Sequence, residues 1–416
     1  MFAAGAAIFA LLYSVQALLP QLATAFGVGP ADAALAMSLA TAAIALAVIP
    51  ASALSERWGR SRVLVGSVVV AAVLGVLLPF SPDFAVLLAI RTLQGVAMAG
   101  MPAVAMAYLA DEIHPSALAG AVGTFVAGNG LGGLAGRLLA GVATDAGGWR
   151  AGLAAVSGLS IGCAAAFWAL LPAQRHGARV VVRGGLRRHL RDPALRRLYL
   201  AGFALSGGFV TVYNYLGFRL LGAPFHLSPA LVGLIFLAYL AGTAASAAAG
   251  RLADRHGPPG VQAAVVVLAV LGVLATLPDW LPTVLVGLVL VTAGFFAGHA
   301  VAGGWVSRTA DTARGQAAGL YLFAFYAGGS VGGWLGGLVF EHAGWTATAL
   351  YVVALFVLGL APVVRRRAVR RRSTAEPATA PSRTSSPGVP PAWRGSSRPH
   401  ARRGPTGPRA ARTSSR

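Results

Sequence analysis

The chain of 416 residues contains no lysine, a single cysteine and only 12 acidic residues. Without lysine the phosphate-binding loop GxxxxGK[ST] cannot be formed, so the chain cannot hydrolyse ATP by itself. One cysteine, Cys163, is too few for a disulfide framework or a cysteine metal site. The zinc motif HExxH is also missing, and no pair of carboxylates lies in an apolar segment. We therefore expect a protein that is not an enzyme and that needs no metal or cofactor.

Basic charge, by contrast, is abundant, because the 33 cationic residues are all arginine and give a formal net charge of +21. Much of it lies in residues 365–416, a tail rich in Arg, Ser, Pro, Thr and Ala with little to bury, which we expect to be disordered. Its first block, RRRAVRRR, can contact anionic lipid headgroups. The alternatives are a tail without function and an over-read gene end. Nucleic acid is not an expected partner.

Long apolar stretches dominate the rest of the chain, which is 56% hydrophobic and 11% charged with a mean hydropathy of +0.71. Such a composition indicates an all-α membrane protein, because helices satisfy their own backbone in lipid and about 20 apolar residues cross the bilayer core. The sequence predicts twelve transmembrane helices, at 3–26, 33–55, 61–80, 84–109, 117–143, 149–171, 197–221, 229–251, 260–277, 282–306, 314–340 and 345–364.

A basic connection divides these spans into two groups of six. Residues 1–171 form the predicted N-terminal half, 172–196 the central loop and 197–364 the C-terminal half. The loop sequence LRRHLRDPALRR predicts a short helix at the membrane surface. The N-terminal segment MFAAGAAIFALL lacks the basic region of a secretory signal, so we expect it to be an uncleaved first span.

Arginine distribution predicts the orientation, because short cytoplasmic loops retain positive charge. Both termini are expected in the cytoplasm, with little arginine outside beyond Arg150. The arginines that this orientation places inside are those of the central loop together with Arg57, Arg60, Arg62, Arg251, Arg255, Arg308 and Arg314.

The two halves repeat one another in sequence. SALSERWGRSR at 52–62 corresponds to GRLADRHG at 250–257, with Gly257 lying 198 residues after Gly59. A glycine ladder follows at 128–141 and again at 328–337, and Trp345 lies 196 residues after Trp149. Small residues let membrane helices approach closely, so the ladders predict tight packing, which is compatible with a role in a bending helix.

An arginine inside a predicted span is costly and is by default a functional candidate. Arg91 occurs in the run LxxxRxxQG together with Gln94. Either it belongs to the transport mechanism, or it snorkels or braces neighbouring helices.

These motifs together resemble the major facilitator superfamily, whose loop signature is G-x-L-A-D-R-x-G-R-K. The resemblance covers residues 1 to about 364, although Ser52 replaces the opening glycine and Glu56 the aspartate in the first copy. It implies a fold of two pseudo-symmetric six-helix halves that act by alternating access. The loop residues would then form a gate on the cytoplasmic side, or serve only as topogenic charge: Leu54, Glu56, Arg57, Gly59, Arg60, Gly250, Asp254, Arg255 and Gly257.

Within the superfamily, residues 91–150 resemble bacterial efflux permeases of the drug and arabinose-exporter kind, in particular the YnfM-like group. The glycine motif of such exporters usually has proline where this chain has Arg137. That departure weakens the antiporter interpretation of the motif.

The resemblance implies a substrate cavity between the halves, whose lining we expect among the polar residues inside spans. Any one of them is more often a satisfied hydrogen bond between helices, but the set is typical of a pocket for an amphipathic organic molecule. The candidates are Tyr13, Gln16, Asn129, Tyr213, Asn214, Tyr215, Tyr321 and Tyr326.

No carboxylate lies deep in a predicted span, so His299 is the expected proton carrier, tuned by Arg91. A neutral, hydrogen-bonded His299 is the alternative. Taken together, the sequence predicts a monomeric exporter of small organic molecules in the bacterial inner membrane, driven by protons. Uptake by symport is the alternative direction, and a sensor that does not transport is a third possibility.

Overall fold

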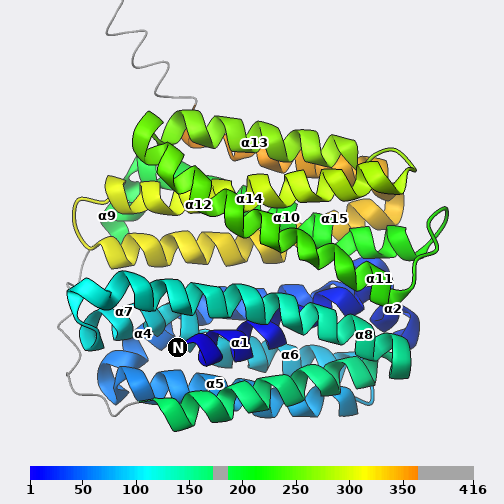
Figure 1. Cartoon of the computed structure of the whole chain (residues 1–416), viewed down its shortest axis with the longest axis horizontal. Helices are drawn as coiled ribbons and strands as arrows, with labels where there is room; N and C mark the ends of the chain where they lie inside the picture. Colours follow the sequence, from blue (N-terminus) through cyan, green and yellow to red (C-terminus); the bar gives the residue numbers. More distant parts are fainter. Residues whose placement is uncertain (172–185, 364–416) are drawn as a thin grey trace, which may run out of the picture. The chain divides into compact units, whose positions relative to one another are not determined.

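The computed structural model describes residues 1–171 and 186–363, and these form helices without any strand (Figure 1). In this part of the chain nine helical segments are long and apolar enough to cross a membrane. The predicted all-α membrane fold is confirmed, whereas the count of twelve crossings stays a prediction. The tail and the loop arginines Arg175, Arg179 and Arg183 lie outside the described residues.

The N-terminal half begins with a helix that is interrupted by one 3₁₀ turn, and most of its later helices are continuous. Its elements are α1 (Phe2–Ser14), η1 (Val15–Leu18), α2 (Leu19–Phe26), α3 (Pro30–Ala33), α4 (Leu35–Trp58), α5 (Arg60–Leu77), η2 (Leu78–Phe80), α6 (Phe84–Met98), α7 (Gly100–Glu112) and α8 (Pro115–Leu170).

The C-terminal half follows the short helix α9, and its first long helix begins four residues before the predicted span. Its elements are α9 (Leu186–Arg191), α10 (Pro193–Leu221), α11 (Pro229–Leu234), η3 (Ile235–Leu237), α12 (Ala238–His256), α13 (Pro258–Ala275), α14 (Leu281–Thr309) and α15 (Arg314–Leu358).

Two of these elements, α8 and α15, each contain two helices joined at a kink. The kinks lie at Gly147–Gly148 and at Gly344. Gly148 has φ 76° and Gly344 has φ 68°, values that side chains with a Cβ rarely adopt. Both kinks come directly before the duplicated tryptophans, where the sequence predicts a break between spans.

The repeated loop motif forms a tight turn in each half. Gly59 joins α4 to α5 with φ 93°, and Gly257 joins α12 to α13 with φ 82°. The glycine of the motif is therefore required by backbone geometry, independently of any role in gating.

The glycine ladders pack α8 against α1 and α15 against α10. A Cβ placed on Gly132 would lie 2.3 Å from the Cα atom of Ala6, and one on Gly328 would lie 2.0 Å from the carbonyl oxygen of Phe203. The predicted close packing is thus confirmed in both halves.

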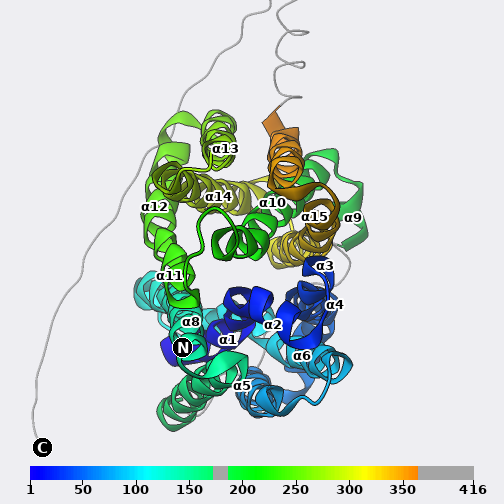
Figure 2. The ribbon, with the colours of Figure 1, turned by 90° about the vertical axis from the view of Figure 1, so that its right-hand side faces the viewer.

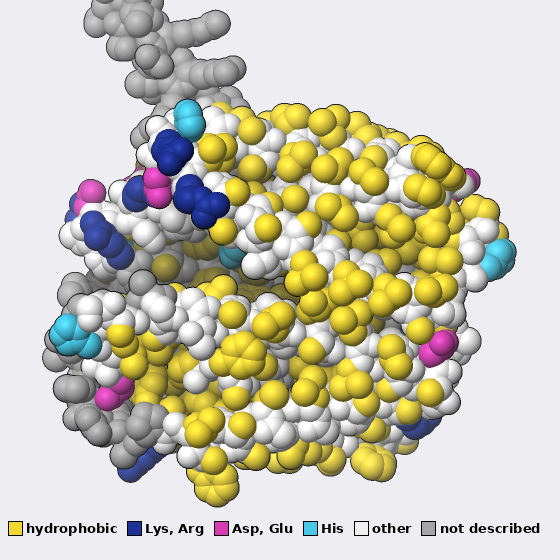
Figure 3. Space-filling model, viewed as in Figure 1, with side chains coloured by type: hydrophobic (Ala, Val, Ile, Leu, Met, Phe, Trp, Pro, Cys, Tyr) yellow, Lys and Arg dark blue, Asp and Glu magenta, His cyan; other side chains and the backbone are white. Residues whose placement is uncertain are grey.

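The two halves meet most extensively in two places. Helix α11 lies beside α8, while α3 and α4 lie beside α15 (Figure 2). We call the end of the helices that carries Arg57, Arg255 and Arg308 the basic end, and the end with the connections at 27–29, 81–83 and 276–280 the opposite end. Figure 3 shows arginines gathered at the basic end and a furrow between the halves there.

Candidate functional site at the interface of the halves

A buried arginine forms the centre of the interface. Arg137 in α8 is 1% exposed and donates from Nε and Nη2 to Oε1 of Gln16, at 3.1 and 2.8 Å. Its Nη2 also donates to the hydroxyl of Tyr239 in α12, at 2.9 Å, and its Nη1 to the carbonyl oxygen of Gly133, at 3.1 Å. The guanidinium of the N-terminal half is thereby bonded to a phenol of the C-terminal half.

Aromatic rings surround the same guanidinium. Its central carbon lies 4.1 Å from the ring centroid of Tyr13, 4.5 Å from that of Tyr239 and 4.8 Å from that of Phe236. Such rings attract a cation through their quadrupoles. They stabilise the charge without neutralising it.

Two more hydrogen bonds between described residues join the halves. Gln16 donates from Nε2 to Oδ1 of Asn214 at 2.8 Å, and Ser330 donates from Oγ to the carbonyl oxygen of Ser38 at 2.6 Å. Gln16, Asn214 and Ser38 lie nearer the opposite end of their helices. Together with the Arg137–Tyr239 bond, these contacts hold the halves together toward that end.

No carboxylate reaches this cluster within the described part of the chain. Every Asp and Glu there lies in a connection or near a helix end. Arg137 consequently has only neutral acceptors and aromatic faces around it. A buried charge without an opposite partner is energetically expensive, so such a group is a strong candidate for function.

A second set of aromatic contacts surrounds His299 in α14. Its Nδ1 lies 3.0 Å from the Tyr321 hydroxyl, and its ring lies 4.5 Å from that of Phe325 and 6.1 Å from that of Phe295. Phe295 in turn stacks on Phe209 with centroids 3.7 Å apart. The imidazole is partly buried and has the phenol as its side-chain partner.

Three neighbouring candidates, Tyr213, Asn214 and Tyr215, point in different directions because successive helical residues are about 100° apart. Only Asn214 bonds to the N-terminal half. The hydroxyl of Tyr213 lies 2.6 Å from that of Thr292, and Tyr215 donates to the carbonyl oxygen of Gly333 at 2.8 Å. Both tyrosine hydroxyls therefore bond within the C-terminal half.

The other four cavity candidates do not form one site. Tyr13 covers Arg137, whereas Tyr321 bonds to His299. Asn129 packs against Gly5 of α1, where its Oδ1 is buried without a hydrogen-bond partner. Tyr326 is 5% exposed and lies edge-on to the Phe325 ring.

Arg91 is fully buried inside the N-terminal half. It donates to the carbonyl oxygens of Ala36 at 2.8 Å, Leu11 at 3.2 Å and Leu12 at 2.9 Å, and to Oε1 of Gln94 at 2.6 Å. These bonds tie α6 to α1 and α4. The geometry is that of a brace, and no contact between described residues joins Arg91 to His299.

The loop motif forms ion pairs within each half. Arg60 pairs with Asp111 and donates to the carbonyl oxygen of Ala107 at 2.6 Å. In the second copy Asp254 accepts from Arg308 at 3.2 Å, and both side chains are exposed. Glu56, Arg57 and Arg255 are exposed, and the described residues provide no bond that would carry them across the basic end.

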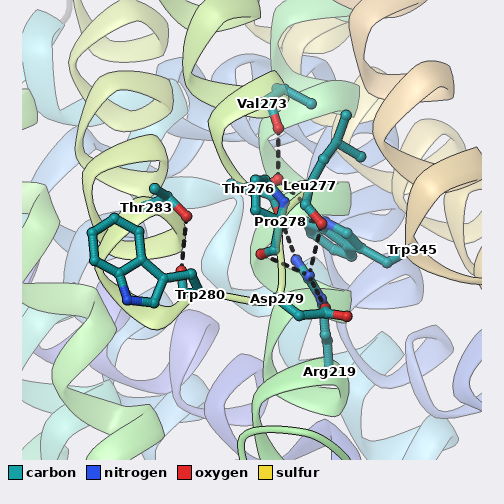
Figure 4. A network of polar contacts seen from close by, with 9 residues as sticks. All are labelled: Arg219, Val273, Thr276, Leu277, Pro278, Asp279, Trp280, Thr283 and Trp345. Carbon is teal, nitrogen blue, oxygen red and sulfur yellow. Dashed lines mark hydrogen bonds and ion pairs between the residues drawn. The ribbon is translucent and has the colours of Figure 1, made fainter.

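An arginine that the sequence reading left out lies at the opposite end. Arg219 donates to the carbonyl oxygens of residues 276–278, at the end of α13, and to Asp279 at 2.7 Å (Figure 4). Trp345 closes the same network, because its indole nitrogen lies 3.2 Å from the Thr276 carbonyl oxygen. From the sequence, little arginine beyond Arg150 was expected at this end.

A serine motif was also missed. Residues 158–162 read GLSIG and residues 328–332 read GGSVG, and both match GxSxG, which in hydrolases places a nucleophile on a turn between a strand and a helix. Here Ser160 lies within α8 and is 0% exposed. Ser330 lies within α15 and is 7% exposed. The described residues also contain no group of three His, Cys, Asp or Glu that could hold a metal ion.

Comparison with known proteins agrees with this architecture. The family profile described as Major Facilitator Superfamily matches residues 1–220 and 198–406. The chain is 40% identical over 365 residues to the inner membrane transport protein YnfM of Escherichia coli (strain K12), covering 86% of this chain and 88% of that protein. It is 38% identical over 368 residues to the uncharacterized MFS-type transporter YybF of Bacillus subtilis (strain 168), covering 86% and 91%.

Solved structures share the fold at low identity. A bacterial homolog of the human lysosomal transporter Spinster, in an inward-facing and occupied conformation, has a TM-score of 0.67 at 15% identity and covers 90% of this chain and 96% of its own. The nucleoside transporter NupG, in a mutant form, has a TM-score of 0.69 at 13% identity, covering 87% and 100%.

The duplicated helical halves and these matches define a multi-pass membrane transporter. The chain belongs to the Major Facilitator Superfamily, and the predicted resemblance to YnfM is confirmed.

Proposed function

We propose that the chain is a secondary exporter of the bacterial inner membrane, which moves small organic molecules outward in exchange for protons. The basic end faces the cytoplasm in this proposal, in agreement with the positive-inside rule. The observation that carries it is the position of the hydrogen bonds that the pairs Gln16–Asn214, Arg137–Tyr239 and Ser330–Ser38 make between the halves, because these bonds of the described residues lie toward the opposite end. The halves are bonded toward the opposite end, and the furrow between them lies at the basic end. With the basic end in the cytoplasm, the transporter can take up its substrate from there.

His299 is the proposed proton carrier. Its Nδ1 and the Tyr321 hydroxyl are 3.0 Å apart, and either group can be the donor while the imidazole is neutral. Protonation makes both ring nitrogens donors, so the phenol must then act as acceptor. The phenol can at the same time donate to the His299 carbonyl oxygen, 3.3 Å away, so the contact between α14 and α15 is compatible with a protonated imidazole.

The experiment uses inside-out membrane vesicles energised by respiration, with a dye that records the lumenal pH. A panel of antibiotics, sugars and charged dyes is added to wild type, to His299→Ala and to His342→Ala. His342 is the matched control because it is exposed at the opposite end. We expect a compound-dependent proton leak in wild type and in His342→Ala, and its loss in His299→Ala.

Two results would contradict the proposal. An equal leak in all three proteins would remove His299 from the proton path. Silence across the panel, with the protein present and folded, would favour uptake or another coupling ion.

A further inference from the structure

The surroundings of Arg137 point to the chemical class of the substrate. We propose that the transported molecule is an organic anion, an aromatic carboxylate, whose carboxylate group takes the place of the Tyr239 hydroxyl on Arg137. This inference rests on the proposed transport function and specifies its substrate.

The charge of Arg137 is unbalanced at the interface. Arg137 is 1% exposed, its acceptors are neutral oxygens, and the carboxylates of the described residues all lie near helix ends. An isolated cation in a medium of low dielectric constant attracts an anion strongly and repels a second cation. Arg91 does not offer the same site, because its bonds lie within one half.

The hydrogen-bond donors of Arg137 suit a carboxylate. A guanidinium has five N–H groups in a planar fork, which suits a carboxylate that accepts two hydrogen bonds in parallel. Arg137 makes four hydrogen bonds to three neutral oxygens. Exchange of the phenol for a carboxylate replaces a neutral acceptor with a charged one.

The aromatic rings around Arg137 suit a substrate with an aromatic body. Tyr13, Phe236 and Tyr239 lie against the guanidinium, and the aromatic contacts continue through Phe209 to Phe295. An aromatic ring joined to the carboxylate would pack on these rings in offset or edge-on geometry.

The exchange also has a conformational consequence. The bond from Arg137 to Tyr239 is one of those that join the halves among the described residues. A carboxylate that displaces the phenol removes that bond, so binding favours separation of the halves at the opposite end. Recognition of the anion and opening toward the outside are thereby the same event.

The test compares three probes of similar size on the purified full-length protein: benzoate, benzyl alcohol and benzylammonium. Binding is measured by titration calorimetry and by the shift in melting temperature. We expect benzoate alone to bind wild type, and Arg137→Gln to lose this binding. Tyr239→Phe should bind benzoate roughly tenfold more tightly, because the competing acceptor of a charged hydrogen bond is gone.

Tyr351→Phe is the matched control, since its hydroxyl bonds to the Gly332 carbonyl oxygen within α15. It should bind benzoate as wild type does. If Arg137→Gln does not fold, the affinity of Tyr239→Phe for benzoate, compared with that of Tyr351→Phe, tests the proposal by itself.

Three outcomes would overturn the assignment: preferential binding of benzylammonium, benzoate binding that Arg137→Gln and Tyr239→Phe leave unchanged, and no benzoate binding to any variant. Failure of the export proposal is distinguishable. Proton-coupled export of benzylammonium would keep export and reject the anion, whereas benzoate taken up with protons would keep the anion and reject export.

Discussion

Removing one hydroxyl group should loosen the contact between the halves. The Tyr239→Phe substitution deletes the acceptor that Arg137 reaches at 2.9 Å but keeps the ring that lies 4.5 Å from the guanidinium carbon. Of the bonds that join the halves, it affects only this one. The other two, from Gln16 and Ser330, remain.

The magnitude follows from the chemistry of the bond. A hydrogen bond to a charged group is worth about 1.5–3 kcal/mol. Arg137 keeps Gln16 as acceptor for the same nitrogen, so we expect the lower value, about 1.5 kcal/mol. That changes the equilibrium between the closed and separated states roughly tenfold, so a separated state populated at about 1% would rise to about 10%.

Double electron–electron resonance measures the populations. Spin labels on Ala146→Cys and Ala343→Cys report the distance between the halves at the opposite end, because both residues are exposed beside the kinks. Cys163 is replaced by alanine to leave these two thiols. We expect the long-distance population to grow in Tyr239→Phe and to stay unchanged in Tyr351→Phe. Equal distance distributions in the two variants would refute the conclusion that the Arg137–Tyr239 hydrogen bond holds the halves together.

The other predictions concern packing, bracing and gating. Gly132→Ala should lower the free energy of unfolding by about 1–3 kcal/mol, because its Cβ would meet the α1 backbone, whereas Gly130→Ala, with open space, should not; equal melting temperatures would contradict this. Arg91→Lys should lower the free energy of unfolding by about 1–3 kcal/mol, because lysine cannot make the guanidinium's hydrogen bonds to the backbone of two other helices. An unchanged melting temperature together with lost transport would instead indicate that Arg91 acts in proton coupling. Glu56→Arg should favour states open at the basic end, so cysteine accessibility that is unchanged on both sides would remove Glu56 from the gate.

Much of the fold was predictable because its signals are local. Apolar length predicted the helices, and the glycine spacing predicted the faces of α8 and α15 that pack closely. The turns at Gly59 and Gly257 were visible as a repeated motif. Such features depend on residues near one another in the sequence, so they need no knowledge of the tertiary arrangement.

The candidate site was only partly predictable. Gln16 and Asn214 were selected singly as polar residues in spans, and Arg137 because it replaces the proline of the exporter motif, but the sequence does not indicate that the three residues meet. Tyr239 was missed because it lies in the apolar run LIFLAYLAG, where its phenol has no polar neighbour. Contacts that join elements from opposite halves depend on how the halves pack, and no short-range pattern records that arrangement.

The hydrogen bonds from Arg219 to the carbonyl oxygens after α13 limit the length of that helix in the lipid bilayer. Helix α13 has 18 residues, a length of about 27 Å at 1.5 Å per residue, whereas α14 has 29. Gly257 turns the chain directly before α13, and Arg219 holds the carbonyl groups at its other end, so this helix cannot lengthen by adding a turn. Where α13 borders the bilayer, the mismatch in thickness is met by local thinning of the bilayer, by flanking side chains that reach toward the interface or by oligomerisation. Membrane thickness therefore becomes a variable that acts on this transporter through one helix.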